Sequence, residues 1–146
     1  MNKTEIKETY EWSAKRKFGL TWSMYTLVAM LIGAFWHAKW FERQYKEFNF
    51  ITASEINVPL ALISMLLLGF ITTYFFSHIY KVNNGIFGSI KTGIIVLLVP
   101  RMVVAFAYAA EQDVNGKGLN LILLEFGLYF IMSIIWGFVS GKIYIR

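Results

Sequence analysis

The chain has 146 residues, of which 57% are hydrophobic and 18% aromatic, while only 16% are charged and the mean hydropathy is +0.52. A soluble domain has about 45–50% apolar and about 25% charged residues, so this composition excludes a disordered chain, a basic nucleic-acid module and an ordinary cytosolic enzyme. The net charge of +5 therefore does not indicate a nucleic-acid partner, and the positions of the basic residues relative to a membrane matter more than their sum.

The first 17 residues form a polar segment ahead of the first apolar run. Ile6, Tyr10 and Ala14 recur at helical intervals, and three basic residues follow at 15–17. We expect residues 1–17 to form an amphipathic helix on the cytoplasmic membrane surface, in contact with anionic headgroups. The alternative is a solvated tail that carries only a topology signal.

Four apolar stretches are long enough to cross the roughly 30 Å hydrocarbon layer of a bilayer as helices. They cover residues 18–36, 58–80, 86–108 and 119–141. These stretches lack the strict apolar/polar alternation of a membrane β-barrel strand, and they are about twice its length. The sequence therefore predicts an all-α integral membrane four-helix bundle that forms one domain over residues 1–146.

The link between the first two spans, residues 37–57, is rich in aromatic residues. Phe41, Tyr45 and Phe48 recur at i, i+4 and i+7, and charged residues occupy the other side. This pattern predicts a short helix that lies in the outer membrane interface and ends near Asn49. Its aromatic side is expected either to anchor the bundle or to form a platform for a ligand.

The other links are short. Asn57 and Pro59 are typical of a helix start, so they suit the beginning of the second span. Residues 81–85 predict a tight turn between the second and third spans, and residues 110–118 a short polar loop. Because short links make sequential helices antiparallel neighbours, we expect the second and third spans, and the third and fourth, to pack side by side.

Basic residues near the ends of the spans predict the topology. A cytoplasmic N-terminus places four basic residues outside, at Lys39, Arg43, Lys46 and Lys117. It places nine inside, at Lys3, Lys7, Lys15, Arg16, Lys17, Lys81, Lys91, Lys142 and Arg146. This asymmetry predicts that both termini are cytoplasmic.

Three fully charged side chains lie inside the predicted spans: Lys91, Arg101 and Glu125. At about 1.5 Å per residue, Arg101 lies ~12 Å and Glu125 ~9 Å from the link between the third and fourth spans, so the two charges have nearly the same depth. An unpaired charge in hydrocarbon costs about 2.5–3.5 kcal/mol on insertion scales. We therefore predict an intramembrane ion pair between Arg101 and Glu125.

Pro100, directly before Arg101, predicts a kink because proline cannot donate to the carbonyl four residues earlier. Such a kink opens a polar pocket where Arg101 can bind an anionic lipid headgroup or another anion. The alternative is a satisfied salt bridge that only fixes helix packing. Lys91 lies near the inner end of its span and is expected to extend to the headgroups as an anchor, although it is also a candidate lipid ligand.

Small residues recur every fourth position in the last two spans and let helix backbones approach closely. They are Gly85, Ser89 and Gly93 in the third span, and Ser133, Gly137 and Gly141 in the fourth. One such stripe is expected to serve packing within the chain, and the second leaves room for a homodimer.

The sequence predicts no metal site, cofactor or catalytic residue. The chain has no cysteine, which excludes disulfides, thiolate nucleophiles and cysteine-ligated metals. His37 and His78 belong to opposite membrane faces in the predicted topology, so they cannot share a metal.

The chain resembles an uncharacterised family of small bacterial four-helix membrane proteins. The resemblance covers roughly residues 24–141 and rests on hydropathy and on a few motifs: Gly33-Ala34-Phe35-Trp36, then Gly85, Gly88 and Gly93, and finally Gly137. It implies a multi-pass protein of the bacterial cytoplasmic membrane, and it implies no activity and no catalytic residues.

Three functions remain open. The first is a non-enzymatic accessory or structural bundle that oligomerises or binds another membrane protein, with the bilayer and an anionic lipid as partners. The second is a small channel or transporter that uses the polar pocket around Arg101 and Glu125. The third is a lipid-processing enzyme, because the run Glu42-Arg43-x-Tyr45, with Asn49 beyond it, is similar to one in membrane glutathione transferases and leukotriene synthases.

Overall fold

The computed structural model describes residues 3–48, 57–111 and 116–145, and its elements in these ranges are all helical. In chain order they are α1 (Lys3–Phe35), η1 (Trp36–Trp40), α2 (Glu42–Glu47), α3 (Val58–Ile79), η3 (Val82–Asn84), α4 (Gly85–Gly93), η4 (Ile94–Leu98), α5 (Val99–Glu111) and α6 (Gly118–Ile145). The η1 and η4 segments are π-helical turns, and η3 is a 3₁₀ turn.

Four helices are long and apolar enough to cross a membrane: Ser13–Trp40, Val58–Ile79, Val82–Ala110 and Gly118–Ile145. They overlap the four predicted spans, so the expected all-α fold with four such helices is confirmed. Large apolar side chains such as Leu60, Phe87 and Val103 are exposed on the outside of the bundle. A surface of this kind is suited to lipid and not to water.

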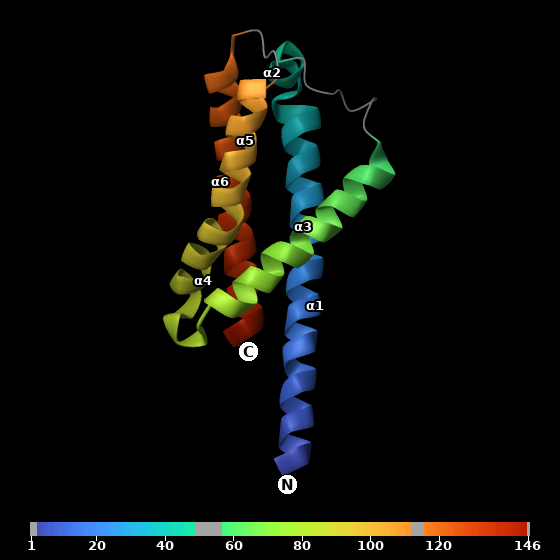
Figure 1. Cartoon of the computed structure of the whole chain (residues 1–146), viewed down its shortest axis with the longest axis vertical. Coiled ribbons are helices and arrows are strands. Elements are labelled where there is room, and N and C mark those ends of the chain that lie inside the picture. The colour runs from blue at the N-terminus through green and yellow to red at the C-terminus, as the bar shows by residue number, and fades with distance from the viewer. Residues whose placement is uncertain (1–2, 49–56, 112–115, 146) are drawn as a thin grey trace.

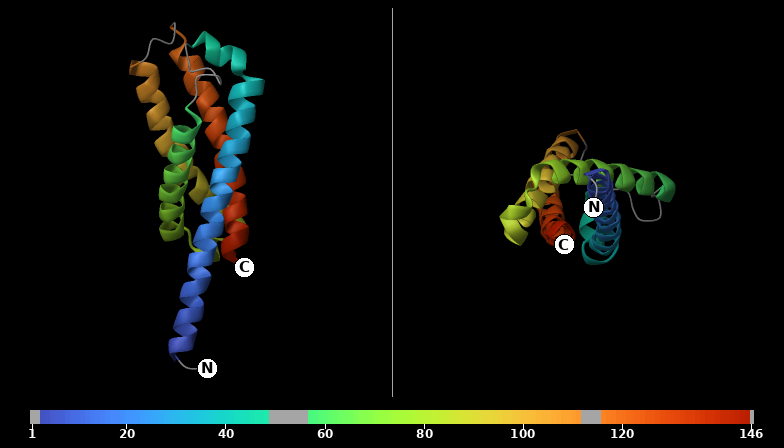
Figure 2. Two further views of the ribbon diagram at one scale, coloured as in Figure 1. Left: turned by 90° about the vertical axis from the view of Figure 1, so that its right-hand side faces the viewer. Right: turned by 90° about the horizontal axis from the view of Figure 1, so that it is seen from below.

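The helices run up, down, up and down, and α6 has the largest share of buried residues among the four spans. It contacts α1 on one side and the continuous helix α4–η4–α5 on the other. Figure 1 shows that α1 begins, and α6 ends, at the same end of the bundle. Figure 2 shows that α1 also projects well past the other helices at this end.

Helix α3 crosses the bundle diagonally and does not run beside α1 along its length (Figures 1 and 2). Its start agrees with the prediction, because the Asn57 side chain accepts a hydrogen bond from the Leu60 N–H at 3.1 Å. Its first half is largely exposed, whereas its buried residues lie in the second half, at Gly69, Thr72, Thr73 and Phe76. The third and fourth spans pack side by side as expected, whereas α3 has far less contact with the third span because it diverges from the bundle in its first half.

The two predicted stripes of small residues face each other between α4 and α6. A Cβ on Gly137 would lie 2.9 Å from Cα of Ile90, and a Cβ on Gly93 would lie 2.8 Å from the carbonyl oxygen of Ser133. The Ser89 hydroxyl also donates to the Gly137 carbonyl across the same contact. Both stripes are thus used within one chain, which leaves neither as a surface for a second copy.

The third span bends where the sequence predicts a kink (Figure 1). The π-helical turn η4, Ile94–Leu98, comes directly before α5, whose second residue is Pro100. Proline removes one donor from the helical ladder, and the wider turn accommodates the displaced carbonyls. As a result α5 leans away from the line of α4.

The N-terminal segment is not a separate surface helix. Residues 3–17 are the first turns of α1, a helix of 33 residues that continues into the first span. Residues 1–2 of the predicted amphipathic segment, and residues 49–56 of the predicted link, lie outside the described residues.

Candidate functional site

The candidate site is a cavity of about 160 Å³ between α5 and α6, in the half of the bundle covered by α2. Arg101 and Tyr108 line it from α5, and Glu125 and Tyr129 line it from α6. The predicted equal depth of Arg101 and Glu125 thus corresponds to a shared cavity. Its volume exceeds the roughly 30 Å³ that one water molecule occupies in the liquid.

Glu125 is buried and takes its hydrogen bond from a residue far away in the chain. The Tyr45 hydroxyl of α2 donates to Oε1 of Glu125 at 2.6 Å. Burial of Tyr45, together with the neighbouring Glu125 charge, raises the pKa of its hydroxyl far above the usual value, so this group stays protonated and keeps donating. A donor to a buried carboxylate offsets part of the cost of removing it from water.

The predicted ion pair between Arg101 and Glu125 is not formed: the ion pairs of the described ranges do not include it. The Arg101 guanidinium instead lies over the Tyr129 ring, with Cζ 5.0 Å from the ring centroid. The two charges still interact across the cavity. The two groups have other partners: the Tyr45 hydroxyl donates to the Glu125 carboxylate, and the Tyr129 ring face binds the Arg101 guanidinium.

Arg101 retains an unfilled hydrogen-bonding group. Its Nε is buried and has no hydrogen-bond partner, and the same is true of the Tyr25 hydroxyl, which comes from α1. The Tyr25 side chain is only 1% exposed, and its hydroxyl interacts with the charge of Arg101. Buried donors are normally satisfied, so the unpartnered Nε of Arg101 marks a place where a further acceptor would be stabilised.

Tyr45 reaches Glu125 because α2 folds across the end of the bundle (Figure 2). Its apolar side is buried, with Tyr45 at 4% and Phe48 at 3% exposure, while its charged residues face outward. This helical face agrees with the predicted i, i+4 and i+7 pattern. The buried side packs onto the protein, so Tyr45 is part of the site and not of a lipid anchor.

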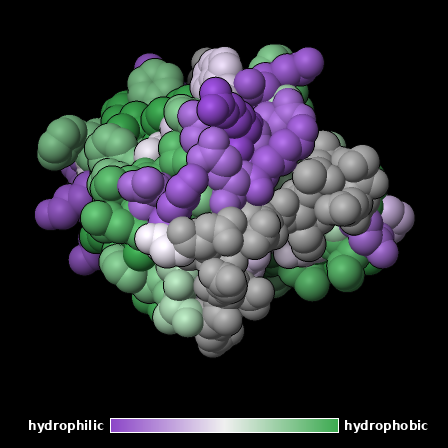
Figure 3. Space-filling view, turned by 90° about the horizontal axis from the view of Figure 1, so that it is seen from above, coloured by the Kyte–Doolittle hydropathy of each residue, from purple (hydrophilic) through white to green (hydrophobic). Residues whose placement is uncertain are grey.

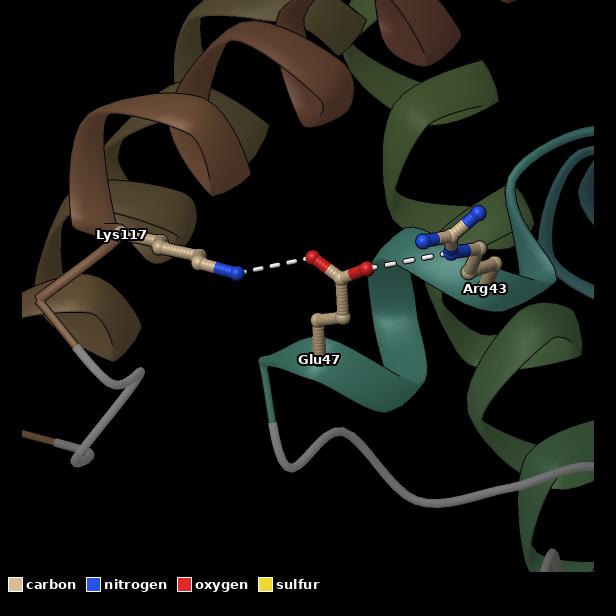
Figure 4. Close-up of polar contacts among 3 residues, drawn as sticks. All are labelled: Arg43, Glu47 and Lys117. Atoms are coloured by element: carbon tan, nitrogen blue, oxygen red, sulfur yellow. Dashed lines mark hydrogen bonds and ion pairs between the residues drawn. The ribbon is translucent and has the colours of Figure 1, made fainter.

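An exposed ionic contact holds α2 against the start of α6 (Figure 4). Lys117 donates to Oε2 of Glu47 at 2.7 Å, and Nε of Arg43 donates to Oε1 of the same carboxylate at 3.3 Å. The hydrogen bond from Lys117 and its positive charge lower the pKa of Glu47. Figure 3 shows hydrophilic residues gathered on this end of the molecule.

The remaining predicted site residues lie elsewhere. Lys91 is exposed on α4, and it does not line the cavity, so it is separate from Arg101 and Glu125. Pro100 lies beside Arg101 and shapes the helix, as expected. Sequence reasoning missed Tyr25, Tyr45 and Tyr129 as site residues, although the i, i+4 spacing of Glu125 and Tyr129 places both on one helical face.

No group of three or more potential metal ligands is found among the residues that the structure describes. The His37 ring packs at a tilt against the Tyr45 ring, with centroids 4.3 Å apart, whereas His78 hydrogen-bonds to the carbonyl oxygen of Tyr74 at 2.8 Å. The run similar to membrane glutathione transferases is divided by the fold, because Tyr45 points inward and the Arg43 side chain is 89% exposed. Asn49 of that run lies outside the described residues.

Comparisons of this chain with protein-family models, with curated proteins and with solved structures find no match. The resemblance to a bacterial four-helix family therefore stays a prediction from the residues quoted for it. The site lies in a bundle that has four helices long and apolar enough to cross a membrane.

Proposed function

We propose that the protein is a non-enzymatic accessory bundle of the bacterial cytoplasmic membrane that binds a small anionic group beside Arg101. The observation that carries the proposal is the buried Nε of Arg101, which has no partner and adjoins a cavity. A phosphate or carboxylate oxygen is the acceptor that a guanidinium binds best. Such a group can arrive as a lipid headgroup or as a free anion.

Charge balance adds a condition to this binding. Arg101 and Glu125 neutralise each other across the cavity, so an added anion leaves an excess negative charge in a medium of low dielectric constant. Protonation of Glu125 removes that excess. Anion binding is therefore coupled to proton uptake at Glu125, and by linkage it is stronger at lower pH.

The test measures thermal stability of the purified protein in a neutral detergent with inorganic phosphate, acetate or phosphatidylglycerol, each against chloride at equal ionic strength. A ligand at about 100 times its Kd stabilises the folded state by about 2.7 kcal/mol, which corresponds to a rise in Tm of roughly 5–10 °C. We expect this rise with at least one probe for the wild type and for Arg43→Gln, the matched exposed arginine.

Arg101→Gln should abolish the rise, and Arg101→Lys, which keeps the charge but lacks Nε, should reduce it. The proposal is rejected if no probe stabilises the wild type, or if Arg101→Gln responds like Arg43→Gln. A response to phosphatidylglycerol alone identifies a lipid ligand, whereas a response to phosphate or acetate identifies a free anion.

The proposal includes the predicted topology, with both ends in the cytoplasm. Its support is the excess of basic residues at the ends where α1 begins and α6 ends. Reporter fusions after Arg146 and within the link at residues 49–56 should show cytoplasmic and external locations respectively. The opposite pattern would reverse the assignment of the two membrane faces.

A small proton-coupled transporter is a second candidate, favoured by a series of buried hydroxyls that have no partner. They belong to Thr21 and Tyr25 of α1, Thr73 of α3 and Ser140 of α6. Proteoliposomes with a pH-sensitive dye inside test it: Glu125→Gln should abolish proton flux, and Glu42→Gln on the exposed face of α2 should not. Absence of flux in the wild type excludes this function.

A further inference from the structure

A second and larger cavity, of about 650 Å³, lies at the opposite end of the bundle. Its walls come from α1, from the ends of α3 and α6, and from η3. The residues that give it its character are Lys15, Lys17, Phe18, Trp22, Ser77 and Tyr144. This cavity shares no residue with the site around Arg101, so it requires its own explanation.

The rim of this cavity is basic. Lys15 and Lys17 line it, and among its described lining residues there is no acidic side chain. Lys17 uses one of its three N–H groups on the carbonyl oxygen of Tyr144, at 3.1 Å. That bond holds the ammonium at the C-terminal end of α6, and an ammonium has two further N–H groups that can donate to an anion.

The inner wall is aromatic and rigid. The rings of Phe18 and Trp22 both contact Phe70 of α3 edge to face, with centroids 5.4 and 5.5 Å apart. The Trp22 indole N–H is held by the carbonyl oxygen of Leu66 at 2.9 Å. An apolar surface therefore continues from the cavity up the outside of α1 and α3, toward the centre of the membrane.

The order of these features along α1 matches the order of chemical groups in a phospholipid. Lys17 and Trp22 are five residues apart, which is about 7.5 Å along a helix axis. Lys15 and Lys17 precede Trp22 in α1, so they lie nearer its N-terminal end, which is the end that projects past the other helices (Figure 2). A ligand that fills the cavity thus meets positive charge first and an aromatic wall below it.

We propose that this cavity binds an acidic phospholipid from the leaflet at this end, with the headgroup phosphate between Lys15 and Lys17 and an acyl chain against Phe18, Trp22 and Phe70. Charge complementarity selects an acidic headgroup, and the wall selects a lipid over a free anion. The site is independent of the anion site proposed beside Arg101.

The test is native mass spectrometry of the full chain titrated with dioleoyl phosphatidylglycerol and, separately, with dioleoyl phosphatidylcholine. Each basic side chain near an anionic group contributes roughly a fivefold factor, so Lys15→Gln with Lys17→Gln should weaken phosphatidylglycerol binding by about 25-fold. The matched control is Lys81→Gln with Lys142→Gln, two lysines of the same end outside the cavity, which should change binding less than twofold.

Equal binding of the two lipids by the wild type, or unchanged binding by the Lys15 and Lys17 variant, overturns the proposal. The single variant Lys17→Arg keeps the positive charge and a donor to the Tyr144 carbonyl. Its affinity for phosphatidylglycerol should therefore stay near that of the wild type, unlike that of Lys17→Gln. A second measurement needs no lysine variant and uses lipids with brominated acyl chains, which quench tryptophan fluorescence. The Trp22 signal is the difference between the wild type and Trp22→Phe. Brominated phosphatidylglycerol should quench this signal more than brominated phosphatidylcholine. Equal quenching also overturns the proposal.

Discussion

Two helix contacts in this bundle differ in kind, although both join apolar spans. Helices α4 and α6 meet through glycine and serine, so their backbones touch, as at Gly137 and Ile90. Helices α1 and α3 meet around one glycine, Gly69, and α3 then diverges into the surroundings (Figure 1). Where small residues recur every fourth position the helices stay together, and where they do not, a single close approach leads to a crossing.

The largest effect should come from breaking the close contact with Gly137→Val. The new Cβ would lie 2.9 Å from Cα of Ile90, and backbone cannot move aside as a side-chain tip can. We expect a loss of about 3 kcal/mol in the free energy of unfolding, the upper end for overpacking. Unfolding by SDS titration in mixed micelles measures it. Gly33→Ala, where nothing lies within 4 Å, is the control and should be neutral or slightly stabilising.

The next effect should come from the polar contact that joins α2 to α6. Tyr45→Phe leaves the buried carboxylate of Glu125 without its donor, which should cost about 2 kcal/mol. The same titration measures this loss. In a cycle with Glu125→Leu, which has no acceptor, the two losses should not add, because each variant removes the same hydrogen bond. Additive losses would show that the bond contributes little to stability.

A substitution at Gly69, where α1 and α3 cross, should reduce the free energy of unfolding less than the substitution at Gly137. Gly69→Ala places a Cβ 2.6 Å from Cδ1 of Tyr25, so the ring must shift, and we expect a cost of about 1 kcal/mol. Gly19→Ala, with open space around it, serves as the control. A loss as large as that of Gly137→Val would mean that α3 is held as firmly as α4, which would remove the contrast.

The smallest effect belongs to the exposed contact between Lys117 and Glu47. Lys117→Ala should change the midpoint of unfolding slightly, and the change should disappear in high salt because exposed ion pairs are screened. The folded-state pKa of Glu47 is lowered, so its contribution is present above the unfolded pKa of Glu, about 4.3, and is lost as the pH falls through the folded value. A pH titration of the midpoint in wild type and variant measures this loss.

The sequence predicts the parts of this fold that depend on local physics. Span length follows from the hydrocarbon thickness, Asn57 marks the start of α3 by its side-chain acceptor, and the buried face of α2 follows from helical periodicity. The crossing of α3 does not follow, because it depends on the shape of Trp22 and Tyr25 around Gly69. The fit between two helices depends on the side chains of both, and the hydropathy of a single helix does not predict it.

The candidate site divides in the same way. Counting residues from a short link places Arg101 and Glu125 at one depth, and both line one cavity. The partner of Glu125 could not be predicted from depth, because Tyr45 lies 80 residues away along the chain and reaches it from a helix outside the spans. Rotation of a side chain about its helix decides whether two charges meet, and residue spacing leaves that rotation undetermined.

The length of α1 has a mechanical consequence. Its 33 residues make a rod of about 50 Å, whereas the hydrocarbon layer is roughly 30 Å thick. Helix α1 packs against α6 and α3, and its N-terminal part projects past the other helices (Figure 2). A change in the tilt of α1 about this packed part therefore moves the projecting part sideways by a larger distance than the packed part.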